Sequence, residues 1–406
     1  MISGYIEFSP PESRQSSSCF NLDCTGVEHG TPIGRGLPVT ASFEYSGSVT
    51  ILENISLAQF TTLAVGGPAR WFIETADEAE ILAAVRFARQ QRVPYFILGG
   101  GSNLLVSDDG FPGVVIRLTG KNVEIDSRDV ATIRADAGVE WDSIVRLAVE
   151  NNCDGIECLA GIPGSVGGTP VQNVGAYGQE VSGTIEGVRA VDLQTDTVVE
   201  LSPNQCGFAY RRSIFNTTHR GRYAITRVMY GFTLGGAPNL AYRDVKNYFA
   251  EHAIAHPSLA ETAAAVREIR ARKGMLIAAD DPDSRSAGSF FKNPIVPVAK
   301  IPGLAAIADC HPDEVPQFPA GTDFAPADAM VKLSAAWLIE LAGFRKGYTL
   351  GRAGLSTKHV LAIVNRGGAT ASDIVALRDT IQTAVHARTA IRLEQEPVTL
   401  GFPTSH

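Results

Sequence analysis

A strand, a helix and a second strand that runs directly into three glycines restrict the fold of this chain more than any other segment. Residues 70–74 (RWFIE) and 95–98 (YFIL) are short and apolar, which predicts strands. Between them, Thr75 and Glu78 have the spacing of a capping box, so a helix is predicted to begin there and to end before Pro94. Its buried face is predicted to carry Ile81, Val85 and Ala88. Such a unit is typical of α/β folds, which bind ligands where the strands end.

The loop after the second strand, Gly99-Gly100-Gly101-Ser102-Asn103-Leu104, has the composition of a phosphate-binding turn. Consecutive glycines allow backbone N–H groups to converge on an anion without obstruction by Cβ atoms. A Rossmann site would need a third glycine and the start of a helix at residue 104, whereas residues 104–106 (LLV) predict another strand. A Rossmann nicotinamide site is therefore disfavoured, and a plain glycine-rich turn remains an alternative for this segment alone.

A second glycine-rich segment favours a ligand over a plain turn. Residues 161–170 (GIPGSVGGTP) precede residues 172–178 (QNVGAYG), and neither loop contains the GK[ST] sequence of a P-loop. Two long loops of small residues are able to wrap an extended diphosphate ligand through main-chain donors. The two loops together predict a binding site for such a ligand.

Length, charge and cysteine content narrow the class of protein. The 406 residues suffice for two or three domains, and a 45% apolar content excludes global disorder. The net charge of −8 and the dispersed lysines and arginines argue against a nucleic-acid partner. The six cysteines form no CxxC pair, which predicts free thiols in a reducing cytosol and no metal site. Because no stretch resembles a membrane helix or a signal peptide, we expect a cytoplasmic enzyme without a membrane partner.

The rest of the chain divides into an irregular beginning, a β-rich middle and a largely helical last third. Residues 1–50 are rich in Pro and Ser, which predicts a loosely ordered arm or an over-long gene start. Residues 121–257 alternate short β-rich runs with turns, and Ser258 with Glu261 predicts the capping box of a following helix. One later helix is predicted on Met330, Leu333, Trp337 and Leu341, ended by Gly343, and another on Ile374, Leu377, Ile381 and Val385. A buried strand is predicted between them at residues 360–364.

Three further segments carry polar groups in apolar surroundings. Ser289 lies between a glycine and two phenylalanines, Arg211 lies within residues 209–215 (AYRRSIF), and Glu396 lies within residues 393–398 (LEQEPV), a β-like run with alternating acids. A hydroxyl in a partly dry pocket can protonate a basic carbanion, and a guanidinium fork suits a carboxylate. Taken singly, a turn hydroxyl, a salt-bridged surface arginine and an exposed strand edge explain the same residues.

In this order, FILGGGSN, GIPGSVGG with QNVGAYG, YRRSIF, AGSFFKNP and LEQE closely resemble the UDP-N-acetylenolpyruvoylglucosamine reductase family of flavoenzymes. The resemblance extends from about Leu57 to Phe402, and Tyr242 in residues 241–244 (AYRD) resembles the substrate-loop tyrosine of the family's type I branch. Residues 297–328 look longer than is usual for the family. The resemblance implies an α+β fold, namely a vanillyl-alcohol-oxidase/p-cresol-methylhydroxylase-type FAD-binding fold with an added C-terminal substrate-binding α/β domain.

The resemblance also implies a division into domains. Residues 51–120 and 121–278 would form two FAD-binding subdomains, the first completed by a C-terminal strand within residues 391–406. Residues 279–390 would form the substrate-binding domain, and the arm at residues 1–50 has no counterpart. We expect the chain to act as a monomer on a small-molecule substrate.

The activity implied is the NADPH-dependent reduction of UDP-N-acetylglucosamine enolpyruvate to UDP-N-acetylmuramate through non-covalently held FAD. This step belongs to peptidoglycan precursor synthesis, and hence to cell-wall biogenesis, cell shape and cell division. NADPH would reduce FAD, NADP+ would leave, and hydride would pass from flavin N5 to the vinyl carbon. Arg211 would stabilise the enolate, Glu396 would hydrogen-bond its enolic acid form, and Ser289 would protonate the α-carbon.

Ligand contacts are implied residue by residue. Tyr242 and Lys273 would hold the UDP diphosphate, with Asn293 as a further substrate residue, although Lys273 is also explained as a cation at a helix C-terminus. FAD contacts are implied for Gly99, Gly100, Gly101, Ser102, Asn103, Leu104, Gly161, Ile162, Pro163, Gly164, Gly168, Pro170, Asn173, Gly175, Ala176 and Tyr177.

Two alternatives account for part of the same pattern. An FAD-dependent sugar or lactone oxidase of the same fold would keep both glycine loops but would not need Ser289, Arg211 and Glu396 together. A non-catalytic flavin or nucleotide-sugar binding protein would tolerate the loss of the serine or the glutamate, and both are present here.

Overall fold

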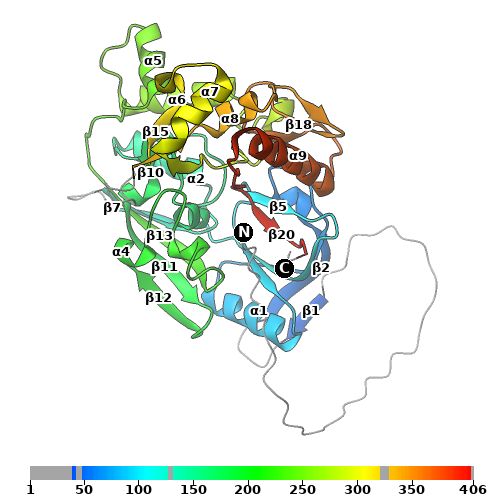
Figure 1. The fold of residues 1–406 in the computed structure, drawn as a ribbon. Coiled ribbons are helices and arrows are strands. Elements are labelled where there is room, and N and C mark those ends of the chain that lie inside the picture. Colours follow the sequence, from blue (N-terminus) through cyan, green and yellow to red (C-terminus); the bar gives the residue numbers. More distant parts are fainter. Residues whose placement is uncertain (1–38, 43–47, 127–130, 321–328, 404–406) are drawn as a thin grey trace.

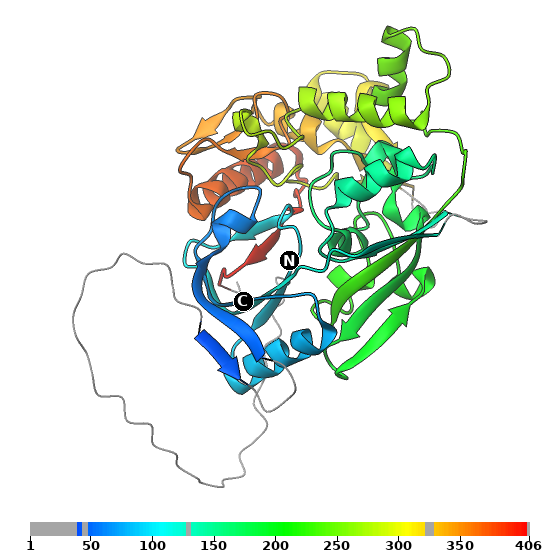
Figure 2. The same ribbon diagram turned by 180° about the vertical axis from the view of Figure 1, so that it is seen from behind.

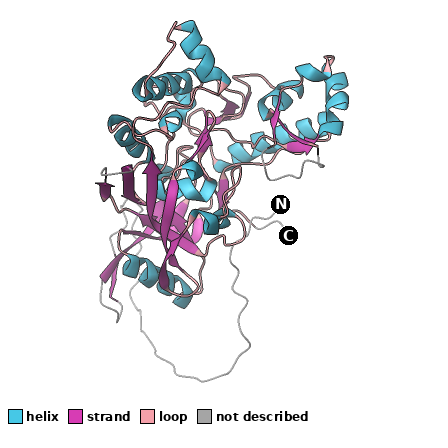
Figure 3. Ribbon diagram, turned by 90° about the vertical axis from the view of Figure 1, so that its left-hand side faces the viewer, coloured by secondary structure: helices cyan, strands magenta, loops and turns pink. Residues whose placement is uncertain are grey.

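The computed structural model describes residues 39–42, 48–126, 131–320 and 329–403 (Figure 1). Most of the expected arm, residues 1–38 and 43–47, lies outside this part of the chain. Within the arm's expected range, β1 (Val39–Ser42) pairs antiparallel with the beginning of β2 (Ser48–Ser56), so this portion forms strands. In Figure 3 the strands of two larger sheets gather in the lower part of the molecule, and most helices lie above them.

The first five-stranded sheet has the order β1-β2-β3-β6-β4. Its further strands are β3 (Pro68–Thr75), β6 (Phe111–Leu118) and β4 (Tyr95–Leu98). Because β3 and β4 both run parallel to β6, helix α1 (Glu78–Gln90) crosses over the sheet between them. Its predicted face of Ile81, Val85 and Ala88 is buried in the core against the sheet, as expected.

The predicted capping box of α1 is wrong. The cap is Asp77, whose carboxylate accepts hydrogen bonds from the backbone N–H groups of Ala79 and Glu80. Thr75 is still the last residue of β3, and its hydroxyl donates to the Glu80 carboxylate instead. The strand extends one residue further than predicted, to Thr75, so the helix is capped two residues later, by the carboxylate of Asp77.

The chain returns to this sheet at its C-terminal end. β5 (Leu104–Val106) begins directly after the glycine loop, as predicted, and pairs in parallel with β20 (Val398–Leu400), drawn in red in Figure 1. Leu104 and Leu400 pack with Phe72 on the face of the first sheet that α1 does not cover. Both faces of the sheet are therefore buried.

The second five-stranded sheet is antiparallel, in the order β12-β11-β13-β8-β7. Its strands are β12 (Thr197–Leu201), β11 (Ile185–Asp192), β13 (Tyr223–Phe232), β8 (Ala131–Asp136) and β7 (Val123–Asp126). α2 (Trp141–Glu150) and α6 (Leu259–Arg272) pack in the same core as this sheet, and α6 begins with the predicted capping box of Ser258 and Glu261. α5 (Arg243–Glu251) contacts α6 and projects from the molecule (Figures 1 and 2).

Short elements lie in the loops of this half. They are α3 (Thr169–Gln172), α4 (Pro203–Cys206), β9 (Gly175–Ala176) and β10 (Gln179–Glu180). The two five-stranded sheets are joined through α1, because Val191 and Ala224 of the second sheet belong to the core that α1 forms with the first sheet.

The last third packs around a core of its own, which also receives Leu63, Val65 and Leu105 from the first half. Its strands form the sheets β14-β16-β15 and β17-β18-β19. These strands are β14 (Ile295–Pro297), β15 (Gln317–Pro319), β16 (Met330–Leu333), β17 (Thr349–Leu350), β18 (Ala353–Leu355) and β19 (Ile363–Asn365). Its helices are α7 (Ile301–Ala308), α8 (Ala335–Leu341) and α9 (Ala371–Thr389).

Two sequence predictions need correction in this part. The helix predicted from Met330 to Leu341 is a strand followed by a helix, because Val331 and Leu333 alternate into the core and Ser334 caps α8 through the Trp337 N–H. The strand predicted at residues 360–364 begins only at Ile363, although the preceding residues are buried as expected. The predicted helix around Ile374–Val385 is α9 and is confirmed.

Disulfide bonds, metal-binding clusters and membrane-spanning helices are absent from the described residues. The four cysteines in the described residues are free thiols, whereas Cys19 and Cys24 lie outside them. No cluster of three or more His, Cys, Asp or Glu side chains that could hold a metal ion occurs in the described residues. None of the helices in that same part of the chain is sufficiently long and apolar to span a membrane.

Candidate active site

A cavity of about 3320 Å³ lies where the parts built on the two five-stranded sheets meet the last third of the chain. Its wall includes the loop after β4, the loop from Ile162 to Tyr177, the C-terminal end of α6, the segment around Ser289 and the segment that leads into β20. The parallel strand β4 therefore ends at this cavity, as the α/β pattern predicted.

The two glycine loops pack backbone against backbone at the cavity. A Cβ atom on Gly100 would lie 2.6 Å from the Cα atom of Gly164, and one on Gly101 would lie 1.7 Å from the carbonyl oxygen of Phe60. Ser102 fastens the loops together, since its Oγ donates to the Pro163 carbonyl at 3.0 Å. Only glycine permits this approach, and the result is a cradle with exposed main-chain donors.

Unsatisfied polar atoms gather in the same cavity. Within the described part of the chain, Trp141 Nε1, Ser165 Oγ, Arg211 Nε and Arg270 Nε are buried without a hydrogen-bond partner, and all four residues line the cavity. Buried polar groups are normally paired, so such a concentration indicates a wall built for a polar ligand.

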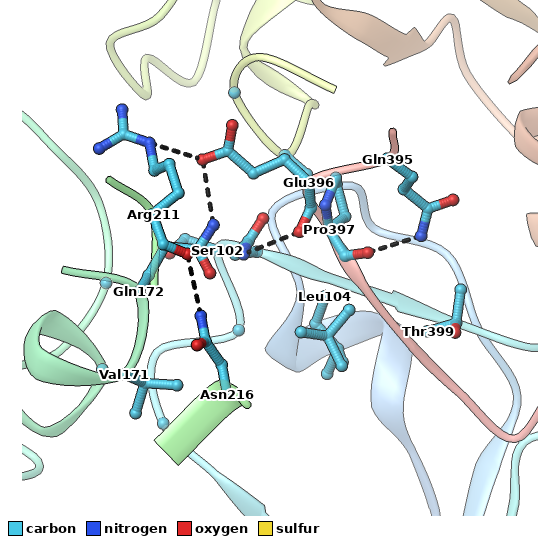
Figure 4. A pocket seen from close by; sticks show the side chains of 18 of the residues that line it. Ser102, Leu104, Val171, Gln172, Arg211, Asn216, Gln395, Glu396, Pro397 and Thr399 are labelled. Carbon is cyan, nitrogen blue, oxygen red and sulfur yellow. Dashed lines mark hydrogen bonds and ion pairs between the residues drawn. The ribbon is translucent and has the colours of Figure 1, made fainter. Parts of the chain in front are cut away.

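An arginine and a glutamate form the polar centre of the cavity (Figure 4). Arg211 Nε lies 3.2 Å from Glu396 Oε1, and the same oxygen accepts a hydrogen bond from Gln172 Nε2 at 3.1 Å. Arg211 Nη2 donates to the Gly175 carbonyl at 2.6 Å. The Arg211 backbone is left-handed, with φ of 56°, and Asn216 Nδ2 donates to its carbonyl at 3.1 Å. This strained conformation points the guanidinium toward Glu396.

Backbone pairing brings Ser289 beside this centre. The Glu396 N–H donates to the Phe290 carbonyl at 2.9 Å, and the Lys292 N–H donates to the Glu394 carbonyl at 2.9 Å. Residues 394–396 therefore pair with residues 290–292, and the strand predicted at residues 393–398 is replaced by this short pairing until β20 begins at Val398. Ser289 lines the cavity, and its hydroxyl has no hydrogen-bond partner among the described residues.

Known proteins match both parts of this architecture. Residues 69–202 match the family model described as FAD binding domain, and residues 280–400 match that of the UDP-N-acetylenolpyruvoylglucosamine reductase C-terminal domain. The UDP-N-acetylenolpyruvoylglucosamine reductase of Thermobifida fusca (strain YX) is 42% identical over 360 residues, covering 87% of this chain and 99% of that protein. The chain belongs to the UDP-N-acetylenolpyruvoylglucosamine reductase family.

Two further similarities agree with this membership. The reductase of Nocardia farcinica (strain IFM 10152) is 44% identical over 361 residues, covering 87% of this chain and 90% of that protein. The crystal structure of the reductase from Thermus caldophilus aligns with a TM-score of 0.58 at 26% identity, covering 87% of this chain and 98% of that one. The expected FAD-binding fold with an added C-terminal domain is thereby confirmed.

The residues expected to bind the reductase substrate all line the cavity. Tyr242 precedes α5, and its ring meets that of Tyr177 edge-on with centroids 5.3 Å apart. Lys273 caps the C-terminus of α6, its Nζ lies 2.5 Å from Asp244 Oδ2, and it lines the cavity. Asn293 also lines the cavity, although its Oδ1 accepts the Ala335 N–H at 2.9 Å.

Most residues expected to contact FAD line the cavity, and three do not. Gly161 is held below the surface by the Asp142 carboxylate, which accepts its N–H at 2.6 Å. Pro170 is buried at the start of α3. Asn173 is buried as well, and its side chain donates to Glu180 and to the Ala209 carbonyl.

Sequence reasoning missed several residues of the wall, including Gln172, Tyr210, Arg270 and His359. Burial lowers the pKa of Arg270, partly offset by Tyr177. Burial, with the nearby positive charge of Lys273, lowers the pKa of His359 to about 4. A signal existed for Arg270, because it lies four residues after buried Val266 and thus on the buried face of α6.

Proposed function

We propose that this chain reduces UDP-N-acetylenolpyruvoylglucosamine to UDP-N-acetylmuramate with Arg211, Glu396 and Ser289 as catalytic residues. The chain is an FAD-containing, NADPH-dependent oxidoreductase of peptidoglycan synthesis. The observation that carries the assignment of residues is the Arg211–Glu396 pair, which lies in the cavity of the glycine loops beside Ser289.

The cavity fits FAD. The cradle of Gly100, Gly101 and Gly164 leaves main-chain donors for a pyrophosphate, and the unpaired Trp141 and Ser165 atoms add buried donors. When bound, FAD supplies the hydride that it has taken from NADPH. Gly99–Leu104 and Ile162–Tyr177 are the segments that we expect to hold it.

Arg211 is suited to stabilise an anion formed from the substrate. Its side chain is 20% exposed, and its Nη1 donates no hydrogen bond to a described residue, so donors remain for a carboxylate or enolate. Glu396 and Gly175 fix the guanidinium before the charge develops. Preorganised donors of this kind stabilise a transition state without reorganisation.

Ser289 holds the proton that we expect to be transferred to the α-carbon. Its hydroxyl is partly exposed to the cavity and is not engaged by another described side chain. A serine is a weak acid in water, but an enolate carbon is basic enough to accept its proton. Tyr242 and Lys273 are proposed to hold the diphosphate of the substrate, and Asn293 to position α8 and the substrate together.

We further propose that the reductase works as a monomer in the cytoplasm, with FAD-binding subdomains at 51–120 and 121–278 and a substrate domain at 279–390. Segments of a single chain supply every proposed catalytic residue, so the site does not require a second copy.

The test is anaerobic stopped-flow spectroscopy of the flavin absorption band with the purified holoenzyme. NADPH should bleach the band, and UDP-N-acetylenolpyruvoylglucosamine should then restore it without oxygen. If only oxygen restores the band, the chain is an oxidase of the same fold and the proposed roles fail. If NADPH does not bleach it, the NADPH-dependent reaction itself is refuted.

A further inference from the structure

Lys332 is a half-buried cation that the site described above does not use. It lies on β16, the middle strand of the sheet β14-β16-β15. Among the described residues it has no ion pair and no hydrogen bond, and its Nζ lies 4.2 Å from the ring centroid of Tyr210. Burying an ammonium without a partner is unfavourable, so its contact with an aromatic face calls for an explanation.

Strand pairing on both sides fixes the place of Lys332 in the sheet. Ile295 and Phe318 are its direct neighbours on the two flanking strands, so the three side chains share one face of the sheet. Phe318 lines the cavity, and the Tyr210 ring lines it as well. This face of the C-terminal part is therefore turned toward the wall that carries Arg211.

The Tyr210 ring contacts a second cation. Arg211 follows it in the chain, and the Arg211 Cζ lies 5.5 Å from the same ring centroid. Burial is the main cause that lowers the pKa of Lys332, the charge of Arg211 lowers it further, and Glu180 opposes both. The ring thus contacts both Arg211 of its own segment and a lysine supplied by the last third of the chain.

We propose that Lys332 is a positioning residue for Arg211, acting through the ring of Tyr210. The ammonium attracts the ring face and holds the ring against the C-terminal part of the molecule. Because Arg211 has a left-handed backbone and directly follows Tyr210, fixing the ring fixes the guanidinium opposite Glu396. The inference rests on the proposed function of Arg211.

The decisive variant is Lys332→Met, which keeps the length of the side chain and removes the charge. NADPH should bleach the flavin of this variant at the wild-type rate. Re-oxidation by UDP-N-acetylenolpyruvoylglucosamine should slow about tenfold, with kcat lowered more than KM is raised, as expected for the loss of one desolvated cation–π contact. Lys332→Arg should recover most of the rate, because a guanidinium also binds an aromatic face. Lys300→Met, on an exposed lysine of the same third, is the matched control.

Tyr210→Leu should slow the same half-reaction, and the double variant Tyr210→Leu/Lys332→Met should be no slower than Tyr210→Leu alone. Additive effects would overturn the inference, as would a Lys332→Met enzyme as fast as the control or a Lys332→Arg enzyme as slow as Lys332→Met. If Lys332→Met loses its FAD or unfolds, Lys332→Gln is measured with the same expectation.

Arg211→Lys, measured in parallel, distinguishes a failure of the proposed role of Arg211 from a failure of the inference about Lys332. If it leaves re-oxidation unchanged, the proposed role of Arg211 falls, and that of Lys332 falls with it. If Arg211→Lys slows re-oxidation but Lys332→Met does not, only the inference about Lys332 is refuted.

Discussion

At the scale of single residues, the site contains polar groups that the fold leaves incompletely paired. Ser289 has a free hydroxyl, and the nitrogen Nε of Arg211 has an ion-pair contact but no hydrogen bond within the described residues. The Arg211 backbone occupies a conformation that non-glycine residues rarely adopt. Such strain and unpaired groups are typical of residues held ready for a ligand.

Ser289→Ala tests the proton donor directly. Removing the hydroxyl should leave the bleaching of the flavin by NADPH unchanged, because no proton of Ser289 is used there. Re-oxidation by the enolpyruvyl substrate should slow by about 10²- to 10⁴-fold, the usual contribution of a general acid. Stopped-flow absorbance separates the two halves, and an equal slowing of both would contradict the assignment. Ser143→Ala is the control, because Ser143 does not line the cavity and its hydroxyl donates only to the Glu140 carbonyl among the described residues.

At the scale of elements, the site depends on two loops that touch through their backbones. The loop after β4 and the loop after residue 161 come from different sheets, and Gly100 and Gly164 are in contact where they meet. The same closeness leaves no room for a side chain. The absence of Cβ atoms therefore permits this close spacing, and the hydrogen bond from Ser102 to the Pro163 carbonyl holds the loops together.

Gly100→Ala should separate the loops and weaken FAD binding. The new methyl group would lie 2.6 Å from the Cα of Gly164, which only a backbone shift can relieve. We expect a fall in the flavin-to-protein ratio of the purified enzyme, and a loss of stability of about 1–3 kcal/mol from overpacking. Absorbance and urea unfolding measure the two effects. Gly183→Ala is the control, because a Cβ there meets nothing within 4 Å; equal flavin content in both variants would refute the prediction.

At the scale of the whole molecule, the cavity exists only because three packed parts keep their relative positions. The two large sheets are linked through α1, because Arg189 of β11 forms a bidentate ion pair with Glu78 at the start of that helix. Nε and Nη2 of Arg189 each donate to one carboxylate oxygen of Glu78 at 2.8 Å. Thr226 of β13 donates to the same carboxylate at 2.7 Å. The core of the last third also contains Leu63, Val65 and Leu105, which lie near the first sheet in the sequence.

The Glu78 link should give stability that depends on pH. Burial by itself would raise the pKa of Glu78, but hydrogen bonds from Arg189 and Thr226 outweigh it and hold the pKa below its ordinary 4.5. The contribution is therefore present above that value and is lost as the pH falls through the lowered pKa.

Glu78→Gln should accordingly lower the free energy of unfolding by about 1 kcal/mol at neutral pH, and by progressively less in acid. Urea unfolding at several pH values measures the difference. Glu200→Gln, which removes the other and more exposed partner of Arg189, should have a smaller effect. A Glu78→Gln difference that does not shrink in acid would contradict the ionic origin.

Local features of the sequence were sufficient for much of the fold. The helix periods of α1, α6 and α9 and the strands β3, β4 and β5 follow from patterns within a few residues. Where two periods fit the same residues, the prediction failed. Met330 and Leu333 suit a helix as well as a strand, and only pairing with β14 and β15 makes this segment a strand.

By itself, the sequence determined the local elements, the two glycine loops and the residue types of the site, because these depend on neighbours along the chain. Only the tertiary structure decided which of them meet. Arg211 and Glu396 are 3.2 Å apart although nearly half of the chain lies between them, and Ser289 joins them through pairing of residues 290–292 with 394–396. Lys332 of β16 reaches Tyr210, which lies in a turn distant in the sequence. Such contacts arise from the packing of distant segments into shared cores, a cooperative property that no short window of sequence contains.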